Sequence, residues 1–135
     1  MISIAVLDDC AREADNIKRL VVDSADVTGG DVRVDVFTEG ADFLENFKND
    51  YDIVFLDIEM PGFDGMTIAK KIRARNSDCC IIFVTNMPQY AIDGYTVDAS
   101  GYILKPIKTT DFRNTLKKAV NRTLIKKEDE TNIML

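Results

Sequence analysis

The residues of this chain that could do chemistry lie directly after apolar runs. Asp8 and Asp9 follow the run ISIAVL, and Asp57 follows IVFL. A carboxylate at the end of a buried strand is costly unless a cation pairs with it or a reaction uses it. Thr85 follows the run CIIFV and Lys105 follows GYIL, so a hydroxyl and an ammonium group occupy the same kind of position.

These residue types favour phosphoryl chemistry. The chain has no histidine, which excludes Ser-His and Cys-His catalysis and the usual general base near neutral pH. Three carboxylates brought close together cannot all ionise comfortably without a cation, and oxygen ligands favour Mg²⁺ or Mn²⁺. A carboxylate nucleophile, a divalent cation and a lysine predict a phosphoryl-acceptor site. Taken singly, each acid could equally be a helix cap or a turn residue.

The elements that must position these residues alternate between strand and helix patterns. Apolar runs predict strands at 2–7, 32–37, 53–56, 80–84 and 101–104, the second being half exposed at an edge of the sheet. Helical spacing predicts helices at 11–22, 40–49, 65–75, 88–94 and 109–124, with Leu44 and Phe47 inward in the second. The stretch SADVTGGD is typical of a turn.

Five strand–helix units in succession predict an α/β fold, a doubly wound five-stranded parallel sheet with helices on both faces. The carboxyl ends of parallel strands meet at one rim, where such folds bind ligands. Neighbouring strands lie about 4.8 Å apart. We therefore expect Asp8, Asp9 and Asp57 to converge at this rim, with Lys105 facing them.

Composition indicates one globular domain of 135 residues with a net charge of −6. The first 104 residues carry −10 and the remainder +4, which argues against nucleic-acid binding across the whole surface and favours a solvated face for the basic last helix. No apolar run is long enough for a membrane span and no signal peptide is evident, so we expect a cytoplasmic protein without a membrane partner. The three cysteines are expected to be buried and reduced.

Four motifs, in order, carry a resemblance to a known family: LDD, LDIEMPGFDG, VTN and YILKPI. Across residues 2–124 the chain resembles the receiver domain of bacterial two-component response regulators. The resemblance implies a flavodoxin-like (βα)5 fold with strand order 2-1-3-4-5. It also implies a receiver domain at 1–124, followed at 125–135 by a helix end and linker toward an output domain outside this chain.

The resemblance implies that Asp57 accepts a phosphoryl group from a sensor histidine kinase in a Mg²⁺-dependent reaction. The metal ligands would be Asp8, Asp9, Asp57 and the backbone carbonyl of Glu59. Thr85 and Lys105 would contact the phosphoryl oxygens. Such a domain is not an enzyme with an external substrate; it assists only its own phosphorylation and dephosphorylation.

The resemblance also implies a switch. Tyr102 matches the aromatic residue that moves inward when Thr85 moves toward the phosphate, and the bond between Lys105 and Pro106 matches a cis peptide. Phosphorylation would change the face formed by the fourth helix, the fifth strand and the last helix, and would favour a homodimer. The segment QYAIDGYTVDASGYILKPI resembles receivers of the LytTR (LytR/AlgR) family, which implies transcription regulation through a DNA-binding output domain.

Two residues depart from the family pattern. Asn86 stands where a small residue usually follows the threonine, and Glu59 adds negative charge two residues after the acceptor. We expect both to alter the lifetime of the phosphorylated state.

Three alternatives remain open from the sequence. One is a phosphatase of the haloacid dehalogenase class with an Asp57 nucleophile, although Met60 fits its motif poorly. Another is a flavodoxin-like binding module, although the loop DDC would repel phosphate. The third is a pseudo-receiver that binds partners without phosphate, against which the intact set of acceptor residues argues.

Overall fold

The central element of the fold is a parallel sheet. The computed structural model describes residues 1–75 and 77–133, and in this part of the chain five strands pair in the order β2-β1-β3-β4-β5. The strands are β1 (Ile2–Leu7), β2 (Val32–Phe37), β3 (Ile53–Leu56), β4 (Cys80–Thr85) and β5 (Gly101–Leu104). All four pairings are parallel. The predicted fold class, strand order and five strands are confirmed; β4 includes one more residue, Thr85, than expected.

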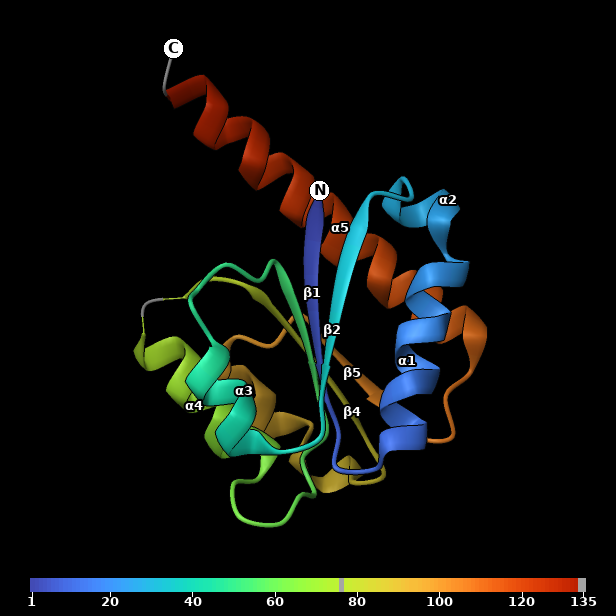
Figure 1. The fold of residues 1–135 in the computed structure, drawn as a ribbon, viewed down its shortest axis with the longest axis vertical. Coiled ribbons are helices and arrows are strands. Elements are labelled where there is room, and N and C mark those ends of the chain that lie inside the picture. Colours follow the sequence, from blue (N-terminus) through green and yellow to red (C-terminus); the bar gives the residue numbers. More distant parts are fainter. Residues whose placement is uncertain (76, 134–135) are drawn as a thin grey trace.

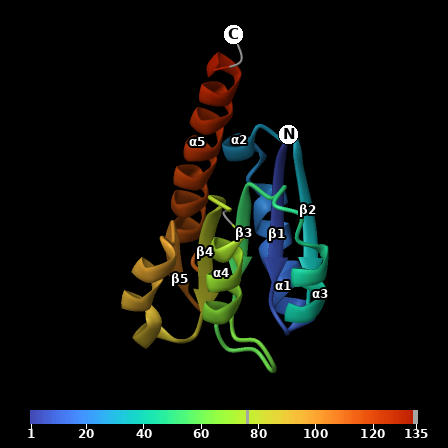
Figure 2. The same ribbon diagram turned by 90° about the vertical axis from the view of Figure 1, so that its left-hand side faces the viewer.

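Helices cover both faces of the sheet. They are α1 (Ala11–Asp23), α2 (Ala25–Thr28), α3 (Gly40–Asn46), α4 (Gly65–Ala74) and α5 (Thr109–Ile133), with two 3₁₀ helices, η1 (Pro88–Tyr90) and η2 (Ile92–Val97). Figure 1 shows α1 and α5 on one side of the sheet and α3 and α4 on the other, and Figure 2 shows the same layers turned by 90°. None of the helices in the described ranges is long and apolar enough to cross a bilayer.

Strand side chains alternate between two apolar clusters. In β1, Ile4 and Val6 pack toward α1 and α5, whereas Ala5 and Leu7 pack toward α3 and α4. This follows from the two-residue period of a strand, and because both faces are covered, β1 reads as a continuous apolar run. The edge strand β2 is only half-buried, as predicted.

Several local predictions are wrong, and the first two concern the chain between β1 and β3. The stretch expected to be a turn contains the short helix α2. The helix expected at 40–49 ends at Asn46, because Phe47 turns into extended backbone while its ring packs against Phe43 and Tyr51. Phe43 is fully buried there, while Leu44 is only partly buried.

The helix expected at 88–94 is instead the pair η1 and η2. In η2 only Gly94 and Val97 are buried, so packing does not enforce the α-helical period. The end of η2 is held by Arg73, whose guanidinium donates to the carbonyls of Val97 and Asp98 at 2.7 and 3.1 Å.

Helix α5 continues well past residue 124, where it was expected to end, and runs to Ile133. Figures 1 and 2 show its last turns projecting beyond the sheet, at the end opposite the carboxyl ends of the strands. The segment after Leu124 contains good helix formers and neither glycine nor proline. Lys126 pairs with Asp78, and Lys127 pairs with Asp52 at 3.4 Å. The expected linker at 125–135 is thus helical to 133, and its last two residues lie outside the described part.

Candidate functional site

Two strand ends place the central carboxylates side by side. Leu7 and Leu56 are partners in the β1–β3 register, so Asp8 and Asp57 follow at the same level of the sheet. Asp8 is fully buried and Asp57 is 6% exposed. Carboxylate oxygens of Asp8, Asp9 and Asp57 all lie within 4.8 Å of one another, and Asp9 is exposed. The predicted convergence is confirmed.

Lys105 faces these acids from the end of β5. Its Nζ lies 2.8 Å from Asp57 Oδ2, 2.8 Å from Asp8 Oδ2 and 2.6 Å from Glu13 Oε2. The Lys105 side chain is only 7% exposed, so its ion pairs with Asp8 and Asp57 are largely shielded from solvent. The peptide bond from Lys105 to Pro106 is cis, the conformation that the resemblance implied.

Glu13 was not among the residues predicted for the site. It lies in the first turn of α1, the helix that begins at the acidic rim. That position was the available signal, because a long side chain in the first turn can reach back toward the strand ends. Its side chain is 45% exposed, unlike those of its two buried neighbours in the ion-pair cluster.

Burial and pairing shift the pKa values in this cluster. Burial raises the pKa of Asp8, and hydrogen bonds from Lys105 and from the Cys10 amide oppose this shift without cancelling it. Burial alone lowers the pKa of Lys105, but hydrogen bonds to Asp57, Asp8 and Glu13 outweigh it and raise that pKa above its usual value. Lys105 is therefore an ammonium group at neutral pH. Its contact with Asp8 does not fully offset the cost of burying the Asp8 carboxylate.

Backbone amides donate hydrogen bonds to the side chains of Asp57 and Thr85. Asp57 Oδ1 accepts a hydrogen bond of 3.2 Å from the Glu59 amide. Thr85 is fully buried, and its hydroxyl oxygen accepts from the Met87 amide at 3.3 Å, which leaves the hydroxyl proton free for another acceptor. The Lys105 amide donates to the Thr85 carbonyl at 2.9 Å, so these two strand ends are tied together.

Helix α4 begins close to the backbone of Asp57. Asp64 caps α4 by accepting from the Thr67 amide at 2.7 Å. The next residue, Gly65, lies against the backbone of Asp57: a Cβ atom there would be 2.0 Å from the Asp57 carbonyl oxygen. Only glycine allows this approach.

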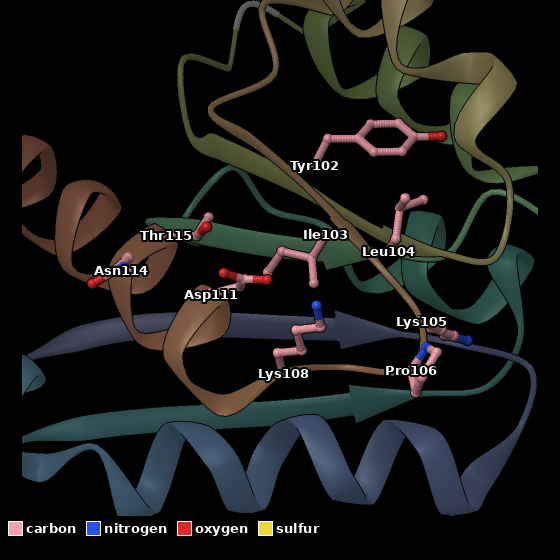
Figure 3. A pocket seen from close by; sticks show the side chains of 9 residues that line it. All are labelled: Tyr102, Ile103, Leu104, Lys105, Pro106, Lys108, Asp111, Asn114 and Thr115. Carbon is pink, nitrogen blue, oxygen red and sulfur yellow. The ribbon is translucent and has the colours of Figure 1, made fainter.

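Tyr102 links β5 to the loop after β4. Its ring lies 5.9 Å from that of Phe83, and its hydroxyl donates to the Met87 carbonyl. Burial raises the pKa of Tyr102. On the outer surface, β5 and the start of α5 enclose a groove (Figure 3), in which Lys108 and Asp111 point toward each other.

The remaining residues singled out in the sequence differ in their exposure to solvent. Asn86 and Glu59 are exposed. The cysteine prediction is partly wrong: Cys79 and Cys80 are buried, but Cys10 is exposed, because it begins α1 at the rim rather than packing beneath it.

The donor set fits a hard divalent cation. Three carboxylates have oxygens within 4.8 Å of one another, and with Glu13, which also contacts Lys105, they outnumber its single ammonium group. Mg²⁺ prefers oxygen ligands and is commonly held by one or two carboxylates together with water. Asp8, Asp9 and Asp57 are therefore the residues that could hold Mg²⁺.

Comparisons with known proteins find relatives that share much of this chain. Residues 4–132 match the family model described as "Response regulator receiver domain". The chain is 34% identical over 123 residues to the sensory transduction protein LytT of Bacillus anthracis, covering 87% of this chain and 47% of the relative. It is 41% identical over 68 residues to the positive alginate biosynthesis regulatory protein of Pseudomonas aeruginosa, covering 50% of this chain and 27% of that protein.

Solved structures are similar over nearly the whole chain. The response regulatory domain of MrkE from Klebsiella pneumoniae has a TM-score of 0.78 at 25% identity, covering 90% of this chain and 98% of that one. A response regulator receiver domain from Clostridium thermocellum has a TM-score of 0.75 at 27% identity, covering 93% and 98%. By contrast, the chain spans less than half the length of the two curated relatives.

Proposed function

This chain belongs to the response regulator receiver domain family, and from that premise we propose that it is a Mg²⁺-dependent phosphorylation switch whose acceptor is Asp57. The observation that carries the proposal is the position of the Asp57 carboxylate at the end of β3. It pairs with Lys105, and its oxygen lies within 4.8 Å of carboxylate oxygens of Asp8 and Asp9.

In the proposed reaction a carboxylate oxygen of Asp57 forms a bond to phosphorus while the bond from phosphorus to the donor nitrogen of a kinase histidine breaks. Lys105 neutralises charge on the transferred group, and the free hydroxyl proton of Thr85 is available to one of its oxygens. Asp8, Asp9, Asp57 and the Glu59 carbonyl would hold Mg²⁺. When bound, the cation supplies further charge neutralisation and orientation.

We further propose that the phosphorylated form changes the surface made by η2, β5 and α5. Thr85 and Tyr102 are both tied to Met87, through its amide and its carbonyl, so a shift of Thr85 toward the phosphate would disturb the Tyr102 contact. The altered surface would favour a homodimer. The LytT relative supports a LytTR-type DNA-binding output domain outside this chain, and with it a cytoplasmic role in transcription regulation.

The test is incubation with acetyl phosphate and Mg²⁺ followed by intact mass spectrometry. We expect the chain to gain one phosphate group, and Asp57→Asn to gain none. Asp64→Ser is the matched control, since it removes a carboxylate from the same loop but retains a residue able to cap α4. This control should be labelled like the parent chain.

Two results would overturn the proposal: no phosphate gain in the parent chain, or an equal gain in Asp57→Asn. Multiple-turnover hydrolysis of small phosphate esters would indicate the phosphatase alternative instead, since a receiver carries the phosphoryl group as a covalent product.

A further inference from the structure

One member of the ion-pair cluster differs from the others. The Lys105 ammonium contacts three carboxylates, and the contact with Glu13, at 2.6 Å, is the shortest. Asp8 and Asp57 are buried at strand ends, whereas Glu13 extends from α1 and is 45% exposed. Glu13 is also absent from the group of carboxylates that lie within 4.8 Å of one another.

This separation matters when the acidic group is engaged. If Asp8 and Asp57 give oxygens to a divalent cation, the ammonium group of Lys105 loses the full charge of two of its three partners. Lysine has a flexible four-carbon stem and high rotamer entropy, so an unpaired ammonium group would leave the rim for solvent. Glu13 alone keeps its charge free for Lys105 in that state.

Hydrogen bonds tie the start of α1, which carries Glu13, to Asp8. The Cys10 amide donates to Asp8 Oδ1 at 2.9 Å, and the Ala14 amide donates to the Cys10 carbonyl at 3.0 Å. The first turn of α1 is thereby tied to Asp8, which places the backbone of Glu13 beside the pocket that contains Asp57.

We propose that Glu13 is a positioning residue for Lys105, holding its ammonium group within reach of a phosphoryl group on Asp57 while the strand-end carboxylates bind the cation. The proposal rests on the proposed function, because Lys105 needs this placement only if Asp57 accepts phosphate. A half-exposed ion pair contributes little to folding, so the effect of Glu13 should be local.

The main experiment compares Glu13→Gln with the parent chain, both saturated with Mg²⁺. The substitution removes the charge and preserves the shape. We expect labelling of Asp57 by acetyl phosphate to be about three- to tenfold slower. Asp15→Asn is the matched control, because it removes the same charge from the exposed face of α1 and should change the rate less than twofold, a limit of about 0.4 kcal/mol.

A second readout does not depend on phosphorylation. Carbon-13 relaxation of the Lys105 side-chain methylene next to nitrogen, in the Mg²⁺-saturated chain, reports how firmly the ammonium group is held. It should be restrained in the parent chain and in Asp15→Asn, and mobile in Glu13→Gln. In a Lys105→Met background, Glu13→Gln should have no further effect on labelling.

The proposal is overturned if Lys105 is equally restrained in Glu13→Gln, or if the rate effect of Glu13→Gln persists in the Lys105→Met background. The second outcome would mean that Glu13 acts on the cation by charge alone. A parent chain that takes up no phosphate would defeat the proposed function, and the relaxation measurement would still decide whether Glu13 positions Lys105.

Discussion

The ammonium nitrogen of Lys105 lies 2.8 Å from Asp57 Oδ2, although 48 residues separate the two in the sequence. Both side chains are 7% exposed, so the largely buried charge of Asp57 depends on Lys105 for compensation, and that of Lys105 depends on Asp57 and Asp8. Removing one partner of a buried ion pair costs much more stability than removing one partner of an exposed pair, because it leaves a buried charge without compensation.

Replacing Lys105 by methionine should therefore destabilise the chain. Without divalent cations we expect Lys105→Met to lower the free energy of unfolding in urea by about 1–3 kcal/mol, because two buried carboxylates lose their counter-ion. Added Mg²⁺ should recover part of this loss. Lys108→Met, at an exposed lysine of the outer groove, should change little; equal stability of both variants would contradict the prediction.

Gly65 should tolerate no side chain. In Gly65→Ala the new Cβ would lie 2.0 Å from the Asp57 carbonyl oxygen, so α4 or the acceptor loop must move. We expect a loss of about 2 kcal/mol or more in urea unfolding, together with slower phosphate labelling. At Gly94 a Cβ would meet Ala99 at an ordinary 3.4 Å, so Gly94→Ala is the control and should be neutral or stabilising.

The hydroxyl of Tyr102 should anchor the loop after β4. Tyr102→Phe keeps the ring on Phe83 but leaves the Met87 carbonyl without this donor. We expect a loss of about 1 kcal/mol in the free energy of unfolding, and faster amide hydrogen exchange in the loop. Tyr95→Phe, at a residue 87% exposed, should alter neither; equal exchange rates in the two variants would count against the anchor.

Stability should fall at alkaline pH, in part through Tyr51. Burial and the hydrogen bond to Asp35 raise the pKa of Tyr51, so the folded chain retains its proton when the unfolded chain, with a tyrosine pKa of about 10, loses it. The contribution of Tyr51 is thus fully present below pH 10 and is lost as pH rises toward its folded pKa. Urea unfolding between pH 8 and 11 should show a decline that is shallower in Tyr51→Phe.

Two exposed residues at the rim should set the lifetime of the phosphorylated state. We expect Asn86→Ala and Glu59→Asn to change the rate of phosphate loss from Asp57, because one alters access to the phosphoryl group and the other alters the charge near it. The decay of the phosphorylated mass after removal of acetyl phosphate measures this rate. Unchanged decay in both variants would contradict the prediction.

Much of the fold and of the site could be predicted, because apolar runs and the helical spacing of apolar residues indicate the strands and helices that position the site. The parallel sheet and its common rim follow from strand–helix alternation, which is why Asp8, Asp57 and Lys105 were expected at one place. The strand order came from the resemblance to receiver domains. The contact of Glu13 with Lys105 could not be predicted, because the reach and rotamers of two long side chains leave no periodic pattern in the sequence.

The wrong predictions of secondary structure have two causes. The 3₁₀ helices after β4 and the early end of α3 are decided by tertiary contacts, such as those of Arg73 with Val97 and of Phe47 with Tyr51. Local pattern carries no information about such distant partners. The extension of α5 was missed because its residues are polar and have no apolar stripe, although their helix propensity is good.

Helix α5 has 25 residues, a length of about 37 Å at 1.5 Å per residue. Among its side chains up to residue 130, the last buried one is that of Thr123, so roughly 15 Å of the helix, at the same rise, extends outside the packed layers. A tilt of only about 10° at the buried half would move the far end by about 3 Å over that length. A small adjustment at the sheet would therefore be enlarged at the far end of this helix, and the contacts of Lys126 and Lys127 with Asp78 and Asp52 would limit that displacement.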